Sequence, residues 1–198
     1  VKKFFLDYAP SLSDFTVDLS SQEVTIHKKS AEDWKITLID TGLATMTGGR
    51  IKQAIKFLDL SETFCLTYGD GLSDIDISAS IQFHKNHKKM STVTAVTPPG
   101  RFGVLDIDST NEVKGFREKI ASDQYRINGG FFVLEPSVND YISDDSTVWE
   151  QDPMRNLAKD GEMRAWGHDG FWQPMDTLRD KQTLEELWQT GNPPWRRH

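Results

Sequence analysis

The sequence has a single cysteine, Cys65, so no disulfide can form within the chain, and a reducing cytoplasmic location is expected. It contains no run of about 20 apolar residues, the length that a membrane-spanning helix needs. It also lacks an excess of positive charge, because 23 Lys and Arg stand against 30 Asp and Glu, a formal net charge of −7. A nucleic-acid binder or a membrane-surface protein needs a basic patch, so neither kind of partner is expected.

The order of the hydrophobic patterns predicts an α/β protein with a single domain over 1–198. Strands separated by helices favour βαβ units and a mixed, mostly parallel sheet. Alternating or continuous apolar runs predict the strands, and apolar residues three to four apart predict the helices. The expected strands are 15–19, 24–27, 34–40, 64–68, 93–96, 102–107, 113–117, 129–134 and 163–167, and the expected helices are 1–8, 51–58, 77–84, 149–159 and 177–189.

The run 64–68 is apolar or β-compatible at every position, which predicts a buried strand with Cys65 as a small core residue. Asp70, between Gly69 and Gly71, closes this strand, and a helix capped by Ser73 or Asp74 is expected to follow. Ligands bind at the carboxyl ends of strands in open α/β sheets, so Asp70 could hold a hard cation such as Mg²⁺. A purely structural tight turn is the alternative.

Asp176 lies in a second motif, 170–180, where aromatic residues, Pro174 and a helix opening at Thr177 would fix it at a rigid corner. It could be the second metal ligand, beside Asp70. The alternative is that Asp176 is the N-cap of the helix, since Asp is among the favoured caps. The two roles can coexist.

A third motif is the glycine- and threonine-rich stretch 41–50. Backbone N–H groups in a glycine-rich turn before a helix make an anion site, and Arg50 could add a bidentate phosphate contact. The alternative is a flexible surface turn with a solvated arginine.

Polar groups suited to a sugar phosphate occur in two further segments. Glu118 can accept from sugar hydroxyls and Lys119 offers a point charge, while Asn128 and Gly129 allow a close polar approach. A rigid loop, 98–103, adds another backbone surface. Each of these taken singly could be a surface charge or a turn.

The histidines show no metal-ligand spacing beyond His84 and His87, a pair expected to mark a solvated helix end. No Ser-His-Asp arrangement and no nucleophile elbow is present. The sequence therefore offers carboxylates, glycine-rich turns and cations for its chemistry.

Taken in order, the motifs resemble those of the glucose-1-phosphate cytidylyltransferases, which are sugar-phosphate nucleotidyltransferases. The resemblance covers the chain from Lys2 to Trp195. It rests on Thr-Gly-x-x-x-Met-Thr-Gly-Gly-Arg, Tyr-Gly-Asp-Gly, Pro-Pro-Gly-Arg-Phe-Gly, Glu-Lys, Ile-Asn-Gly-Gly-Phe-Phe-Val-Leu and Phe-Trp-Gln-Pro-Met-Asp-Thr-Leu-Arg-Asp-Lys. It implies a Rossmann-like fold and a reaction of CTP with α-D-glucose 1-phosphate that gives CDP-glucose and pyrophosphate, for bacterial O-antigen sugars.

The resemblance also implies roles for residues. An oxygen of the sugar phosphate would attack the α-phosphorus of CTP in line, and no protein nucleophile would be needed. Catalysis would therefore come from positioning the substrates and neutralising their charge. By matching motif positions, Asp70 and Asp176 would hold Mg²⁺ and act in catalysis with Lys119; Thr45, Arg50 and Gly69 would contact the nucleotide; and Gly103, Glu118, Lys119, Asn128 and Gly129 would contact the sugar phosphate.

Two parts of the family pattern are not found. The family opens with a Gly-Gly-x-Gly-Thr-Arg loop and a Pro-Lys-Pro segment that hold the triphosphate, and Ile120 stands where Pro usually follows Glu-Lys. We therefore expect an N-terminally truncated, C-terminal portion of the enzyme, inactive alone, with an open sheet edge and a homo-oligomeric assembly. The alternative is a non-catalytic protein that binds sugar phosphate or forms oligomers.

Overall fold

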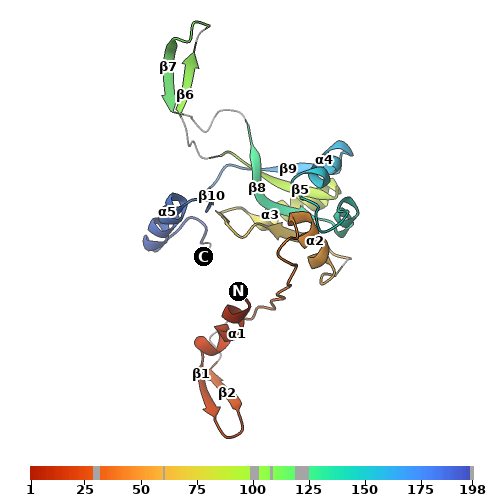
Figure 1. The fold of residues 1–198 in the computed structure, drawn as a ribbon, viewed down its shortest axis with the longest axis vertical. Helices are drawn as coiled ribbons and strands as arrows, with labels where there is room; N and C mark the ends of the chain where they lie inside the picture. The colour runs from red at the N-terminus through yellow and green to blue at the C-terminus, as the bar shows by residue number, and fades with distance from the viewer. Residues whose placement is uncertain (29–31, 60, 99–102, 108, 119–124, 197–198) are drawn as a thin grey trace. The chain divides into compact units, whose positions relative to one another are not determined.

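A computed structural model describes residues 1–28, 32–59, 61–98, 103–107, 109–118 and 125–196 (Figure 1). Its contacts divide the chain into two compact units, Val1–Gly42 and Leu43–His198. The single domain expected over 1–198 stays a prediction. Within the described residues, no helix has the length and apolar character needed to cross a membrane.

The first unit contains a helix and a hairpin, as the sequence predicts. These are α1 (Lys2–Ser11), β1 (Asp14–Asp18) and β2 (Glu23–Lys28), with the two strands antiparallel. Cross-strand pairing sets Phe15 against Ile26 and so places apolar side chains on one face.

The strand expected at 34–40 is wrong, because that segment has no ladder partner among the described residues. The segment instead contacts α1. The Trp34 ring stacks on the Tyr8 ring with centroids 6.3 Å apart, and the Tyr8 hydroxyl donates to Glu32.

The second unit carries the other elements, and most of the helices and strands predicted there are confirmed within a few residues. Three short ones were not predicted: β4, β10 and the 3-10 helix η1. In chain order the elements are α2 (Thr47–Ile55), β3 (Phe64–Thr67), β4 (Gly71–Ser73), α3 (Ile77–His87), β5 (Ser91–Val96), β6 (Gly103–Ile107), β7 (Val113–Glu118), β8 (Ile127–Leu134), η1 (Pro136–Tyr141), α4 (Asp152–Lys159), β9 (Met163–His168), β10 (Trp172–Pro174) and α5 (Leu178–Gln189).

The main sheet has four described strands in the order β3-β8-β5-β9, and Figure 1 shows β8 and β5 side by side. The α/β class and the mixed sheet are confirmed. A parallel majority is not found among these strands, because β8 runs antiparallel to both neighbours and only β5 and β9 pair in parallel. The strands β3 and β5 run the same way and are linked through α3, as in a βαβ unit, but β8 lies between them. Local pattern cannot reveal such an insertion.

The core lies on one face of β8. Phe132 and Leu134 point into it, and Trp149, 0% exposed, packs edge-on to the Phe132 ring with centroids 6.0 Å apart. The other buried members are Ile51, Ile55, Val138, Ile142 and Leu157, from α2, η1, the residue after η1 and α4.

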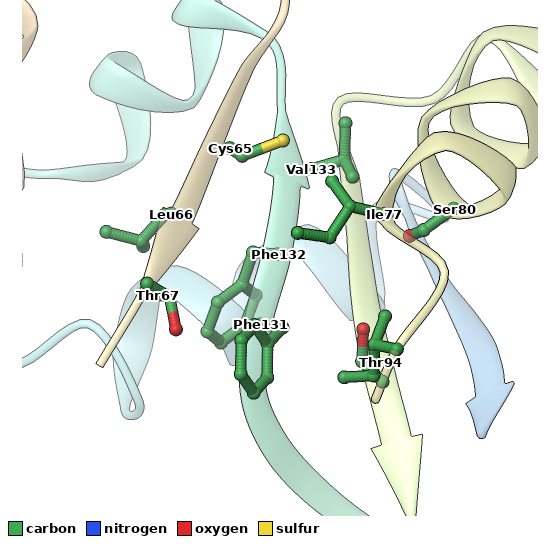
Figure 2. Close-up of a pocket in the computed structure, with 10 residues that line it drawn as sticks. Cys65, Leu66, Thr67, Ile77, Ser80, Thr94, Phe131, Phe132 and Val133 are labelled. Carbon is green, nitrogen blue, oxygen red and sulfur yellow. The ribbon is translucent and has the colours of Figure 1, made fainter. Parts of the chain in front are cut away.

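The strand β3 lies at one edge of the described sheet, not in its interior. Cys65 and Thr67 are exposed while Phe64 and Leu66 are half-buried, so the expectation of a fully buried strand with a core cysteine is wrong. Successive side chains of a strand point to opposite faces. Half-buried and exposed residues therefore alternate along β3, because only one of its faces is covered. Figure 2 shows an apolar pocket of about 110 Å³ beside β3, lined by side chains from β3, β8, β5 and the start of α3.

His84 and His87 do not mark a solvated helix end, and that expectation is wrong. His84 is 1% exposed, with Nδ1 2.8 Å from Thr92 Oγ1 and Nε2 3.0 Å from Glu135 Oε1. Lys89 N–H donates to His87 Nδ1, so neutral His87 carries its proton on Nε2, which lies 2.7 Å from Thr92 Oγ1. Two imidazoles thus share one buried hydroxyl.

This network predicts that acid destabilises the protein. Burial lowers the pKa of His87 below its ordinary 6.5, and positive charge from His84 and Arg164 acts in the same direction. The unfolded chain therefore takes up a proton first, so stability is full above about pH 6.5 and falls as the pH drops through the folded pKa of His87. We expect the urea midpoint to fall between pH 7.5 and 5.5, and to fall less in His87→Gln.

The exposed His27, on the hairpin, supplies a matched control. His27→Gln should keep the full pH dependence of the native chain. An equal midpoint shift in all three proteins would contradict the assignment to His87.

Candidate functional site

A two-stranded ribbon brings the two predicted metal ligands together. The strands β4 and β10 are antiparallel, with Gly71 opposite Pro174, so Asp70 stands opposite Met175, and Asp70 and Asp176 line the same pocket. Met175 N–H also donates to Asp70 O at 2.7 Å. The sequence missed both strands because three residues are too few to show an alternating pattern.

The alternative role of Asp176 as a helix cap is wrong. The N-cap of α5 is Thr177, whose side chain accepts from Asp180 N–H while the Asp180 carboxylate accepts from Thr177 N–H, a capping box. In the described part of the chain, neither Asp70 nor Asp176 forms a hydrogen bond or ion pair through its carboxylate. Both are exposed and can bind a ligand without losing a protein contact.

The cap predicted for α3 is also corrected. Asp76 caps the helix by accepting from Ala79 N–H at 2.9 Å. Ser73 belongs to β4, because the ribbon with β10 extends the chain before the helix can start.

A pocket of about 210 Å³ collects four residues that the sequence singled out, namely Asp70, Asp176, Asn128 and Gly129. Gly69 precedes Asp70, and apart from its chain neighbours no atom of the described residues lies within 4 Å of where a Cβ would stand, so packing against those residues does not require glycine there. The rest of the lining is Tyr68, Gly71, Gly130, Trp172 and Pro174.

Asn128 is held at both ends of its amide. Its Oδ1 accepts from Gly130 N–H at 2.8 Å, and its Nδ2 donates to the Tyr68 hydroxyl at 3.3 Å. An amide has two N–H donors, and Tyr68 uses one of them. Gly129 has a structural reason to be glycine, because a Cβ would stand 2.8 Å from Val96 Cγ1.

Tyr68 is the site residue that the sequence missed, although it stands in the Tyr-Gly-Asp-Gly motif. Its ring crosses Gly130, whose φ of +78° and lack of a Cβ permit the contact. Burial raises the pKa of Tyr68, and the hydrogen bond that its hydroxyl donates to Glu150 adds to the rise. Tyr68 is therefore a neutral hydroxyl that donates to Glu150 and accepts from Asn128.

The glycine-rich stretch does not form a free anion cradle. Gly48 and Gly49 lie inside the first turn of α2, and both N–H groups donate to Thr147 O, at 2.9 and 3.3 Å. A Cβ on Gly48 would stand 2.7 Å from the same carbonyl oxygen. These glycines let the helix dock closely on 145–147, so their own backbone N–H groups are not available to an anion, and an anion contact by the rest of 41–50 stays a prediction.

Thr45 is buried and Arg50 is exposed in this segment, with Arg50 Nη2 donating to Leu43 O at 3.4 Å. Neither lines the pocket around Asp70. Their contact with the nucleotide stays a prediction.

Two of the remaining predicted residues, Gly103 and Glu118, lie on the β6–β7 ribbon. Gly103 and Glu118 are direct cross-strand partners, so the fold brings these two positions together at the ribbon's end. Lys119 lies outside the described residues, as do Ile120 and most of the 98–103 loop.

A divalent metal fits this donor set. Asp70 and Asp176 offer two unengaged carboxylates beside one pocket, and Mg²⁺ prefers oxygen ligands while keeping waters and substrate phosphates in its shell. No group of three or more His, Cys, Asp or Glu with metal-site spacing occurs among the residues described. The pair therefore suits an ion that arrives with a phosphate.

The model of the nucleotidyl transferase family matches residues 16–169. This chain belongs to that family. The glucose-1-phosphate cytidylyltransferases of Salmonella typhi and Salmonella typhimurium are each 50% identical over 196 residues, which is 99% of this chain and 76% of theirs. The resemblance found from the motifs is confirmed.

The fold of the family is also confirmed. HddC from Yersinia pseudotuberculosis superposes with a TM-score of 0.56 at 22% identity, covering 74% of this chain and 64% of that one. At that identity the likeness concerns the fold alone.

Proposed function

We propose that this family member transfers a cytidylyl group from CTP to α-D-glucose 1-phosphate and forms CDP-glucose and pyrophosphate. The observation that carries the proposal is the pocket that gathers Asp70, Asp176 and Asn128 in a chain 50% identical to glucose-1-phosphate cytidylyltransferases. The carboxylates supply the metal end of the site, and Asn128 supplies a fixed polar contact for the acceptor.

Asp70 and Asp176 would hold Mg²⁺, which when bound neutralises charge on the phosphates. Asn128 is oriented by Tyr68 and Gly130 before any ligand arrives, so no rotamer freedom is lost on binding. Glu118 and Gly103 would contact the sugar phosphate with Lys119, while Thr45, Arg50 and Gly69 would contact the nucleotide. A cytoplasmic location and a homo-oligomer belong to the same proposal.

The test combines two measurements on the chain. Calorimetry follows binding of glucose 1-phosphate and of CTP with Mg²⁺, and radiolabelled CDP-glucose formation follows turnover. We expect saturable glucose 1-phosphate binding and weak product formation, with CTP preferred over UTP and dTTP. The Asp70→Asn variant serves as the blank.

A second candidate, a non-catalytic sugar-phosphate-binding protein, is favoured by the position of Thr45 and Arg50, which do not line the pocket around Asp70. It predicts glucose 1-phosphate binding with product no higher than the blank for every nucleotide. Product above the blank rejects it. Failure to bind glucose 1-phosphate rejects both candidates.

A further inference from the structure

The Glu150 carboxylate links two residues, Thr47 and Tyr68, that belong to different elements of the chain. Its Oε1 accepts from the Tyr68 hydroxyl at 2.5 Å, and its Oε2 accepts from the Thr47 hydroxyl at 2.7 Å. Thr47 opens α2 and lies between Thr45 and Arg50, the two residues of this segment predicted to contact the nucleotide. Tyr68 lines the pocket of the two aspartates.

The Thr47 and Tyr68 hydroxyls each accept a second hydrogen bond from another residue. Thr47 Oγ1 also accepts from Trp149 N–H at 2.9 Å, which fixes its rotamer next to the buried core. The Tyr68 oxygen accepts from Asn128 Nδ2, which places the acceptor-side amide at the other end. One carboxylate therefore stands between the first turn of α2 and the amide of Asn128.

The donors and acceptors give this link a direction. An ionised carboxylate only accepts, so the Tyr68 hydroxyl donates its proton to Glu150 and can only accept from Asn128 Nδ2. Thr47 accepts from a backbone N–H and so also donates to Glu150. Within the described ranges, Glu150 forms no ion pair with a cation. The hydrogen bonds that its carboxylate accepts there come from the Thr47 and Tyr68 hydroxyls.

We propose that Glu150 is a positioning residue that couples the nucleotide side of the site to the acceptor side, holding Thr47 with one oxygen and Tyr68 with the other. The inference rests on the proposed function and names a residue that does not line the pocket around Asp70. A hydrogen bond to a charged group stabilises more than a neutral one, so one carboxylate can hold both hydroxyls firmly.

The two arms of the link can be separated by substitution. Thr47→Val should weaken CTP binding about tenfold and leave glucose 1-phosphate binding unchanged. Tyr68→Phe should weaken glucose 1-phosphate binding about tenfold and leave CTP binding unchanged. Each variant loses one hydrogen bond to the charged Glu150 carboxylate. Glu150→Ala should weaken both affinities about tenfold. Glu150→Gln, which keeps one oxygen acceptor, should recover part of the loss.

Calorimetry with CTP–Mg²⁺ and with glucose 1-phosphate measures both arms, and urea unfolding checks that each variant folds. Glu186→Ala, an exposed position on α5, is the matched control and should bind as the native chain does. Tyr68→Phe combined with Glu150→Ala should bind glucose 1-phosphate no more weakly than Glu150→Ala alone.

The inference is overturned if folded Glu150→Ala keeps both affinities within twofold, or if Thr47→Val and Tyr68→Phe each weaken both substrates equally. Either result would reduce Glu150 to a structural contact. A native chain that binds neither substrate rejects the proposed function itself, and the inference with it.

Discussion

Asn in place of Asp176 should lower CDP-glucose formation by about 10²–10³-fold, the loss typical when one group that stabilises transition-state charge is removed. Asp70→Asn should behave alike, because the ribbon places both carboxylates beside one pocket. Amide oxygens are weaker ligands for a hard cation than carboxylates. The variants keep size and shape, so the change removes charge and little else.

Two measurements check this prediction. Radiolabelled product gives the turnover, and electron paramagnetic resonance of Mn²⁺ gives metal binding without any turnover. Asp140→Asn, an exposed aspartate in η1, is the control and should leave both unchanged. Mn²⁺ binding that survives in both Asp70→Asn and Asp176→Asn would refute the metal site.

Trp149→Ala should lower the free energy of unfolding by about 3–5 kcal/mol, the usual cost of removing a large aromatic side chain from a core. Trp149 is 0% exposed, and its ring packs on Phe132 of the central strand β8. Its Nε1 has no hydrogen-bond partner in the part of the chain that is described, so the expected loss comes from packing alone.

Urea unfolding followed by circular dichroism measures this change. Trp188→Ala is the control, since that side chain is 59% exposed on α5 and its removal should cost less than about 0.5 kcal/mol. Similar losses in the two variants would show that Trp149 is not the centre of the core.

The sequence alone determined the elements whose pattern is local and the motifs that define the family. The eight-residue strand β8 and the twelve-residue helix α5 show their periods within one stretch of chain. Asp70 and Asp176 were found as a pair because each stands in a specific motif. The ligand roles of these residues remain predictions.

The tertiary structure decided which polar groups are already hydrogen-bonded within the protein and which are available to a ligand. Gly48 and Gly49 appeared ready to bind an anion, but their N–H groups donate to Thr147 O, a carbonyl about a hundred positions away. The contact between His84 and Glu135 joins residues 51 positions apart, and the contact between Thr47 and Glu150 joins residues 103 positions apart. A hydrogen bond satisfies whichever donor the fold brings near, so its partner cannot be read from neighbouring residues.

Asp70 shows the division most clearly. Its motif indicates a carboxylate at the end of a strand, and the apolar run before it predicts that this strand is buried. The structure puts β3 at the edge of the described sheet and sets Asp70 at the end of a ribbon with β10. Strand order follows from pairing between distant segments, and only the folded chain determines it.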